Sequence, residues 1–371
     1  MDRRATFSAL STNFNVTQPW RGFDELYAAQ PWGSAGEEVA RSLSLDARGH
    51  HVLIGAIGSG KSTELYRAWR GVHGDRGLLA FIEDADLLGD GLTSPRPGLL
   101  AERVGEALVQ NLEREPLRLP EIALQAADRI RRRGRRVAEG LLAGDDLDPT
   151  SADPWSDLKL LRGAFPETTP VAFLDSLDRV RSISEYLTLL EHDLPRLGAL
   201  DICVVMTGPI DLLFGVARER SQVFRELHVV RTLDPSRDAH ARFLDAVLGR
   251  RDVAGLFMPD ARTRMIADCG GHLRHLIALG FAAVRAAQRG TGEAVTLKEA
   301  TEASRRVAEE VASGLLPQSW KALEEIVSGA PLTVEEASLV GLIRTARVFE
   351  TEPGAFRVHP LLRERVLQKV A

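Results

Sequence analysis

The chain contains 371 residues, with 47 Lys and Arg against 52 Asp and Glu, so its formal net charge is −5. Hydrophobic residues make up 44% of it, which excludes a largely disordered chain, and its Gly and Pro residues follow no repeat, which excludes a collagen-like one. Cys203 and Cys269 are too few for a disulfide framework or, alone, a four-ligand zinc site. We therefore expect a globular protein of two or three domains from a reducing compartment.

Signals for membrane insertion or export are absent from the sequence as given. Residues 1–6 are polar, and the longest nearly unbroken apolar run, residues 276–284, is far shorter than the ~20 residues of a spanning helix. We expect a cytoplasmic protein without a membrane partner. The mild acidity argues against nucleic-acid binding over the whole surface, but not against a local basic patch.

Five short apolar runs predict the strands of one sheet. They lie at residues 51–54, 78–82, 171–174, 202–206 and 227–230. Helical patterns such as residues 183–197 separate them, and this alternation predicts a parallel sheet with helices on both faces. A helical insertion at about 94–157 interrupts the alternation between the second and third runs and ends in an acidic loop that contains Asp145, Asp146 and Asp148.

The last third of the chain shows helical patterns and one hairpin. Expected helices cover residues 239–248, 260–267, 273–288 and 297–313, and further helices flank a hairpin at about 347–358. The order helix, helix, hairpin, helix is typical of a trimmed winged helix. We therefore predict three domains: a nucleotide-binding domain at 1–237, a helical lid domain at 238–317 and a winged-helix domain at 318–371.

Residues 55–62, Gly-Ala-Ile-Gly-Ser-Gly-Lys-Ser, match the phosphate-loop pattern G-x-x-x-x-G-K-[ST] at every fixed position. The glycines let backbone N–H groups point inward toward a phosphate, and the start of the following helix adds positive potential. In such a loop Lys61 reaches the β and γ phosphates, and the Ser62 hydroxyl coordinates Mg²⁺. The motif predicts an ATP/ADP site with Mg²⁺.

A phosphate loop needs a carboxylate for the metal, and Asp175 directly follows the third predicted strand. This strand is not the next one after the loop, which favours the additional-strand class of P-loop NTPases, in which another strand separates the two sites. Thr207 directly follows the fourth run, where its hydroxyl can sense the γ-phosphate or the attacking water. An ordinary strand-end threonine is the equal alternative.

The residue after Asp175 is Ser176, where many ATPases of this class have the Glu that activates water. Asp178 is the nearest substitute for that base, so we expect slow hydrolysis. The alternative is that Asp178 caps a helix or pairs with Arg179.

These features together resemble the STAND NTPases, signal-transduction ATPases related to AAA+ proteins. The resemblance rests on the phosphate loop, residues 171–179, the helical domain and the winged helix, and covers about residues 35–371. Two short segments add to it. Residues 270–276 fall where the family has its Gly-x-Pro motif or the AAA+ sensor arginine, and residues 356–363 resemble the winged-helix motif whose His contacts the ADP β-phosphate.

The resemblance implies roles for particular residues. The phosphate-binding set would be Gly58, Ser59, Gly60, Lys61, Ser62 and Thr63. Asp175 would hold the metal, Arg274 would contact the nucleotide, and His359 would lock a closed, ADP-bound form by donating a ring N–H to a phosphate. The alternatives are a surface ion pair for Arg274 and a satisfied junction histidine for His359.

The sequence also departs from the family. Leu273 stands in place of the Pro of the helical-domain motif, and Gly208-Pro209 follow Thr207 where the family commonly has Arg. STAND proteins usually carry an effector domain and a repeat sensor, and neither pattern is visible here. We therefore expect a separate effector or sensor protein as a partner.

Arg218, Arg220 and Arg225 follow the fourth run, where AAA+ relatives present an arginine to a neighbour's γ-phosphate. They predict a nucleotide-dependent oligomer in which one of them acts in trans. A solvated face shared with Glu219 and Glu226 is the alternative.

The arginines between Arg129 and Arg136 form the strongest basic cluster, either for nucleic-acid phosphates or as a solvated face paired with acids. The expected DNA-reading helix of the winged helix carries Glu335 and Glu336, with only Arg344 near its end, so nucleic acid is not the favoured partner.

We interpret the chain as an ATP-binding, slowly hydrolysing molecular switch whose nucleotide state controls assembly or partner binding, in bacterial signalling or antiviral defence as the resemblance implies. The alternative is an AAA+ loader or remodelling ATPase that acts on DNA. A small-substrate kinase is disfavoured because no acceptor site is visible.

Overall fold

The computed structural model describes residues 3–14, 24–75, 77–82, 96–114, 119–138, 153–178, 182–333, 335–352 and 354–370. By its contacts the chain separates into two compact units. The sheet unit consists of Ser34–Ile54 and Lys61–Val230, and the helical unit of Met1–Gly33, Gly55–Gly60 and Arg231–Ala371. Within the described part of the chain, no helix has both the length and the apolar character needed to cross a membrane.

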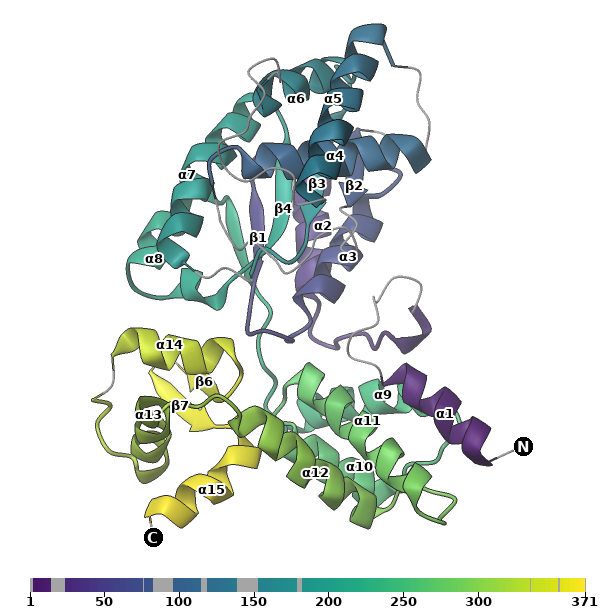
Figure 1. Cartoon of the computed structure of the whole chain (residues 1–371), viewed down its shortest axis with the longest axis vertical. Coiled ribbons are helices and arrows are strands. Elements are labelled where there is room, and N and C mark those ends of the chain that lie inside the picture. The colour runs from purple at the N-terminus through teal and green to yellow at the C-terminus, as the bar shows by residue number, and fades with distance from the viewer. Residues whose placement is uncertain are drawn as a thin grey trace. The chain divides into compact units, whose positions relative to one another are not determined.

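The sheet unit contains the predicted five-stranded parallel sheet (Figure 1). Its strands are β1 (His51–Ile54), β2 (Leu78–Ile82), β3 (Thr169–Leu174), β4 (Cys203–Gly208) and β5 (Glu226–Val229). They lie in the order β2-β3-β4-β1-β5, and every neighbouring pair is parallel. Because β4 lies between β1 and β3, an additional strand separates the strand before the phosphate loop from the strand before Asp175, which confirms the predicted fold class.

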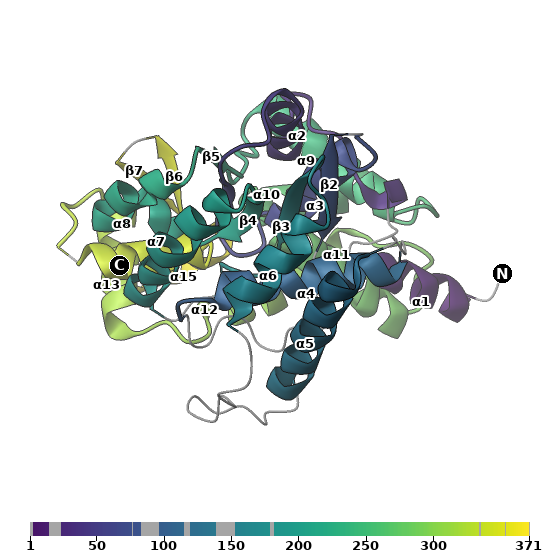
Figure 2. The same ribbon diagram turned by 90° about the horizontal axis from the view of Figure 1, so that it is seen from above.

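Helices cover both faces of this sheet, which explains why its central strands are apolar on both faces (Figure 2). The helices of this unit are α2 (Ala35–Leu45), α3 (Lys61–Val72), α4 (Leu99–Arg114), α5 (Glu121–Ala138), α6 (Pro154–Gly163), α7 (Ile183–Ala199) and α8 (Gly215–Arg220), of which α2, α3, α4 and α7 contact the strands. Val52 and Ile54 of β1 belong to a core shared with α4, α6 and α7. The helix α3 contributes buried Leu65, Ala68 and Val72. Alternate residues of a strand point to opposite faces of the sheet, so His51 and Leu53 of β1 point to the face opposite Val52 and Ile54.

The insertion between β2 and β3 is helical, as predicted, and supplies α4, α5 and α6. In α4, Leu100, Val104 and Leu108 are buried and form an apolar stripe with helical spacing that packs toward β2 and β3. The acidic residues Asp145, Asp146 and Asp148 lie outside the described residues.

The helical unit contains the bundle predicted from Asp238 onward. Its helices are α9 (Asp238–Arg251), α10 (Pro259–Asp268), α11 (Leu273–Arg289) and α12 (Leu297–Ala312). The first helix, α1 (Arg3–Asn13), packs on α11, where a Cβ at Gly280 would lie 2.3 Å from Phe14 Cε1. The Phe14 ring also lies 5.4 Å from that of Phe257, so the start of the chain groups with the bundle rather than with the sheet.

The end of the chain has the predicted order helix, helix, hairpin, helix. The elements are α13 (Pro317–Ser328), α14 (Glu336–Arg344), β6 (Val348–Glu352), β7 (Ala355–Val358) and α15 (Pro360–Val370). The strands β6 and β7 pair antiparallel, with Val348 opposite Val358, and both side chains are buried. The last helix packs on α12 and α13, so this segment and the bundle share one core.

Candidate functional site

Lys61 is the first residue of α3 and is only 4% exposed. Its Nζ lies 2.9 Å from Asp178 Oδ2, at the carboxyl edge of the sheet. A buried ammonium group requires an opposite charge or hydrogen-bond acceptors, and Asp178 provides both. The structure therefore brings together the predicted phosphate-binding cation and the predicted base.

Asp175 directly follows β3, and two donors orient its carboxylate. Its Oδ1 accepts hydrogen bonds from Thr207 Oγ1 at 3.2 Å and from the Ser176 N–H at 2.7 Å. Thr207 is fully buried in β4, so its hydroxyl acts on the carboxylate. Ser176 has a φ of 61°, a left-handed conformation that is uncommon outside glycine and is typically retained at functional sites.

Arg103, which the sequence analysis missed, supports the turn after β3 from the insertion. It is 4% exposed, and its guanidinium donates a hydrogen bond of 2.8 Å to the backbone oxygen of Asp175. The available signal was an arginine on the apolar stripe of α4, beside Leu100 and Val104. A second missed residue, Tyr186, is fully buried, and burial together with the Asp178 carboxylate raises the pKa of its hydroxyl.

The phosphate loop has the backbone that its glycines allow. Gly58 and Gly60 have φ values of 86° and 106°, which residues with a side chain rarely adopt. Ser62 and Thr63 follow in the first turn of α3 and are half-buried. The loop thus leads directly into a helix N-terminus, where backbone N–H groups favour an anion.

Within the helical unit, other residues contact this loop. Arg274 donates its backbone N–H to Gly58 O at 3.2 Å, and His272 donates Nε2–H to Ile57 O at 2.8 Å. The Ile57 N–H in turn donates to Arg344 O at 2.9 Å. A Cβ at Gly58 would lie 2.6 Å from the Cβ of Arg274. The structure therefore places Arg274 directly against the phosphate loop.

His359 is buried, and both of its ring nitrogens are engaged inside the helical unit. The Leu361 N–H donates to Nδ1 at 3.2 Å, so Nε2 carries the proton and donates to His275 Nδ1 at 2.9 Å. The His275 ring lies 4.2 Å from the ring of His272, which bonds the loop at Ile57. His359 is thus linked to the phosphate loop through two other histidines, here named the histidine chain (His272, His275, His359).

Burial keeps the histidine chain neutral. Desolvation is the main cause that lowers the pKa of His275 to about 4, with help from the charges of Arg274 and Arg347. The pKa values of His272 and His359 lie well below their usual range for the same main reason. Neutral rings are required for the donor and acceptor roles described above.

The three arginines proposed for action in trans differ in their surroundings. Arg220 forms two hydrogen bonds of 2.6 Å with Glu191, and Arg225 bonds Asp46 at 2.9 Å. Arg218 is exposed and makes no ion pair within the described part of the chain. Arg218 is therefore the one whose guanidinium is best placed to reach a neighbouring molecule.

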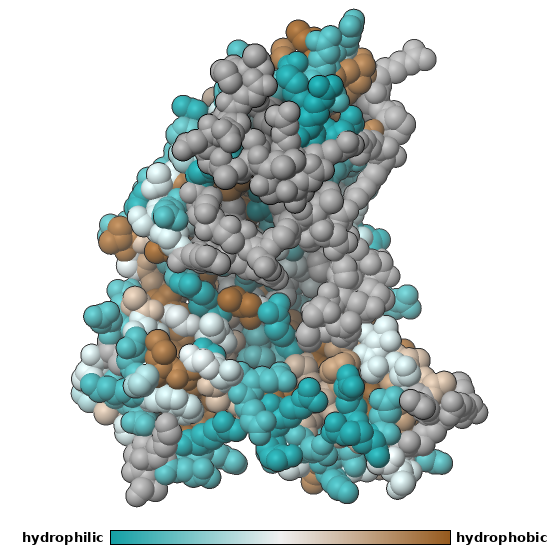
Figure 3. Space-filling view, viewed as in Figure 1, coloured by the Kyte–Doolittle hydropathy of each residue, from teal (hydrophilic) through white to brown (hydrophobic). Residues whose placement is uncertain are grey.

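The described arginines of the basic cluster have acidic partners. Arg129 contacts the buried Asp157 at 2.6 Å, and Arg132 contacts Asp128 at 2.5 Å. The side chains of Arg133, Arg135 and Arg136 lie outside the described residues. Figure 3 shows hydrophilic side chains gathered over α5, which fits the solvated-face alternative for this cluster.

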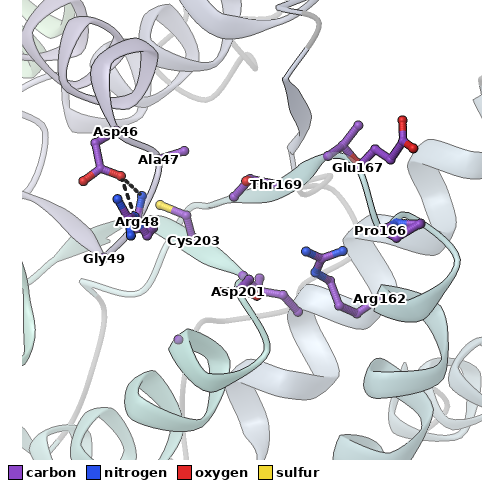
Figure 4. Close-up of a pocket in the computed structure, with 13 residues that line it drawn as sticks. Asp46, Ala47, Arg48, Gly49, Arg162, Pro166, Glu167, Thr169, Asp201 and Cys203 are labelled. Atoms are coloured by element: carbon purple, nitrogen blue, oxygen red, sulfur yellow. Dashed lines mark hydrogen bonds and ion pairs between the residues drawn. The ribbon is translucent and has the colours of Figure 1, made fainter.

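A polar hollow of about 470 Å³ lies at the opposite edge of the sheet, at the amino ends of its strands (Figure 4). Arg48 and Gly49 line it before β1, Thr169 at the start of β3, and Asp201 and Cys203 at the start of β4. None of the predicted nucleotide-binding residues lines it.

The strand order and the phosphate loop define the fold of a P-loop NTPase of the additional-strand class. No family model and no curated protein matches the chain. One similar solved structure is Cdc6p from Pyrobaculum aerophilum, with 14% identity, coverage of 96% of this chain and 97% of that one, and a TM-score of 0.48. Another is the Aeropyrum pernix Orc1 protein in complex with DNA, with 14% identity, coverage of 91% of this chain and 93% of that one, and a TM-score of 0.44. A third is a RuvB variant from Thermotoga maritima, with 15% identity, coverage of 89% of this chain and 94% of that one, and a TM-score of 0.42. At this level the likenesses carry no argument about activity.

Acidification is expected to destabilise the protein through His275. Its pKa is about 4 when folded, against ~6.5 in an unfolded chain, so the unfolded state binds the proton first and stability falls as the pH drops from ~6.5 toward ~4. The His275→Gln variant should lose less stability than the wild type over this window in denaturant titrations. His73→Gln, at an exposed histidine, should keep the wild-type slope. Equal slopes for all three proteins would contradict the assignment.

Proposed function

We propose that the chain binds ATP with Mg²⁺ at residues 58–63 and hydrolyses it slowly to ADP and phosphate. The observation that carries this proposal is the convergence at the carboxyl edge of the sheet of Lys61, paired with Asp178, and of Asp175, held by Thr207. The phosphate loop precedes these groups in the additional-strand fold, where the ends of the strands form the ligand site.

The donor set fits Mg²⁺. A hydroxyl from Ser62 and a carboxylate from Asp175 are the oxygen ligands that Mg²⁺ takes in phosphate-loop sites. When bound, Mg²⁺ neutralises charge that develops on the phosphates. Thr207 and the Ser176 N–H orient the Asp175 carboxylate, and Arg103 fixes the backbone behind it.

Slow hydrolysis follows from the residues after β3. Ser176 cannot act as a carboxylate base, and Asp178, the remaining candidate, is engaged with Lys61. For Asp178 to accept a proton from water, phosphate oxygens would have to replace it as the partner of Lys61. Each turnover therefore includes an exchange of ion-pair partners.

We further propose that the helical unit responds to the nucleotide through the phosphate loop. Arg274, His272 and Arg344 bond the loop backbone at Gly58 and Ile57, so a shift of the loop on phosphate binding changes their contacts. The role of His359 is then indirect, through His275. A lid at 238–317 and a winged helix at 318–371 remain our division of this unit.

This coupling supports a switch that controls assembly or partner binding. Arg218 and Val216 of α8 are both exposed, Val216 by 67%, and Arg218 makes no ion pair within the described residues, so this helix offers a cation and an apolar side chain to a second copy. A separate effector or sensor protein and a role in signalling or defence follow from the STAND resemblance alone. A cytoplasmic location rests on the sequence signals described above.

A loader or remodelling ATPase that acts on DNA is the second candidate, and DNA is the partner to test first because the similar Orc1 structure contains it. The described surface opposes a simple version of this role, since Glu335 and Glu336 at the start of α14 are exposed and Arg129 and Arg132 are paired.

A fluorescence-anisotropy titration with duplex DNA at two salt concentrations decides between the two functions. The switch predicts no binding even at low salt, because the described arginines of the basic cluster are paired with acids and α14 begins with acidic residues. Binding whose affinity falls as salt rises would establish the second candidate instead.

Lys61→Ala should lower ATP affinity by about 10–100-fold, the loss expected when a charge-assisted contact to phosphate disappears. The measurement is calorimetric titration of ATP in the presence of Mg²⁺. Lys159→Ala removes an exposed lysine from α6 and should retain wild-type affinity. Tight binding by the Lys61 variant would refute the site.

His359→Ala should accelerate ADP release, because it breaks the hydrogen bond to His275 and loosens the histidine chain that ends at the phosphate loop. Release of a fluorescent ADP derivative, chased with excess ATP, measures the rate. His73→Ala is the matched control, and an unchanged rate in the His359 variant would remove the histidine chain from nucleotide retention.

A further inference from the structure

Three side chains with metal-binding atoms converge where β1 and β5 pair. His51 of β1 lies opposite Glu226 of β5, and His228 follows two positions later on the same face of β5. His51 Nδ1 lies 3.3 Å from His228 Nε2, His228 Nε2 lies 3.4 Å from Glu226 Oε2, and His51 Nδ1 lies 4.0 Å from that oxygen. The strand register alone therefore assembles two imidazoles and one carboxylate.

These distances match the coordination shell of a small transition-metal ion. Zn²⁺ binds imidazole nitrogen and carboxylate oxygen at about 2.0–2.2 Å, which places tetrahedral ligand atoms about 3.3–3.5 Å apart. Two of the three separations have this value. The third is longer by about half an ångström, and Glu226, whose side chain is 41% exposed, has the freedom to close it.

The facing nitrogens of the two rings are not both protonated. At a separation of 3.3 Å, His51 Nδ1 and His228 Nε2 can share only one proton, so at least one lone pair is presented toward the other ring and Glu226 Oε2.

Residues of α2 hold the ligands from outside. Ser42 Oγ donates to Glu226 Oε1 at 3.0 Å, which leaves Oε2 directed toward the histidines. His228 Nδ1 lies 3.9 Å from Glu38 Oε2, beyond hydrogen-bond distance, so this carboxylate adds negative charge behind the ring. The nearby cation, Arg225, contacts Asp46 at 2.9 Å, and its Nε lies 3.9 Å from Glu226 Oε1, the oxygen that is not directed toward the histidines.

We propose that His51, Glu226 and His228 bind a divalent transition-metal ion of the Zn²⁺ type, with water completing the shell on the exposed side of Glu226. Imidazole ligands favour this class of ion over Mg²⁺ and Ca²⁺, which prefer oxygen. The site lies at the amino ends of β1 and β5, away from Asp175 and Ser62 at the carboxyl edge. A bound ion would tie the edge strand β5 to the strand that leads into the phosphate loop.

The test uses the full chain without a polyhistidine tag, treated with chelator and free of nucleotide. Titration with Zn²⁺ should show one site, and Co²⁺ should give the visible absorption bands of a four- or five-coordinate ion. Zn²⁺, but not Mg²⁺, should raise the thermal unfolding midpoint. No binding of Zn²⁺ by the wild-type protein at micromolar concentrations would overturn the proposal.

Variants locate the ion. His51→Asn and His228→Asn should each weaken Zn²⁺ binding by more than the roughly 10–100-fold typical for residues that only orient a ligand, whereas Glu38→Gln should fall within that range. His73→Asn and Asp175→Asn should bind as the wild type does, the latter because it lies at the other edge of the sheet.

Because His51 is buried, its substitution can also disturb packing. The more exposed ligand, Glu226, therefore provides a second test that does not depend on packing. Glu226→Gln should fold normally by circular dichroism and still lose affinity and alter the Co²⁺ spectrum. Wild-type affinity and spectrum in Glu226→Gln and His228→Asn together would place any bound ion elsewhere and refute the site.

Discussion

The arrangement of the candidate site depends on one local constraint, the sharp bend of the chain after β1. Gly58 and Gly60 adopt left-handed backbone conformations, and the chain enters α3 at Lys61 immediately afterwards. This bend exposes backbone groups at residues 57 and 58 to Arg274 and His272, and it directs Lys61 toward Asp178. The loop and the first residue of α3 therefore make their contacts in different units of the structure, although they are adjacent in sequence.

The sheet could be predicted from the sequence because its information is local. The central strands β1, β3 and β4 are short, mainly apolar runs whose burial on both faces leaves no alternation to misinterpret, and the phosphate-loop pattern identifies which strand is β1. The separation of β1 from β3 followed from the position of Asp175 alone. The observed order, with β4 between them, is what that position requires.

The supporting residues could not be predicted in the same way, because they act at long range. Arg103 reaches Asp175 from a helix 72 positions earlier in the chain, and His275 meets His359 across 84 positions. The segment 270–276 resembles a nucleotide-sensing motif in sequence, but in the structure Gly271 is required for packing, because a Cβ there would lie 1.8 Å from Leu233 O. Spacing along the chain contains none of this information.

The described part of the chain contains two buried histidine clusters, and their different partners give them different chemistry. In the histidine chain, acceptors and donors alternate from Leu361 through His359 to His275, and the nearby charges are the cations Arg274 and Arg347, which repel a metal ion. At β1 and β5 the two rings face each other, with the Glu226 carboxylate beside both nitrogens and the Glu38 carboxylate behind His228. Carboxylates attract a cation that neutral imidazoles can bind, whereas the alternating chain offers it no converging lone pairs. The local charge, rather than the presence of histidine, therefore distinguishes the histidine chain, which links His359 to the phosphate loop, from the cluster at β1 and β5, which is suited to a metal ion.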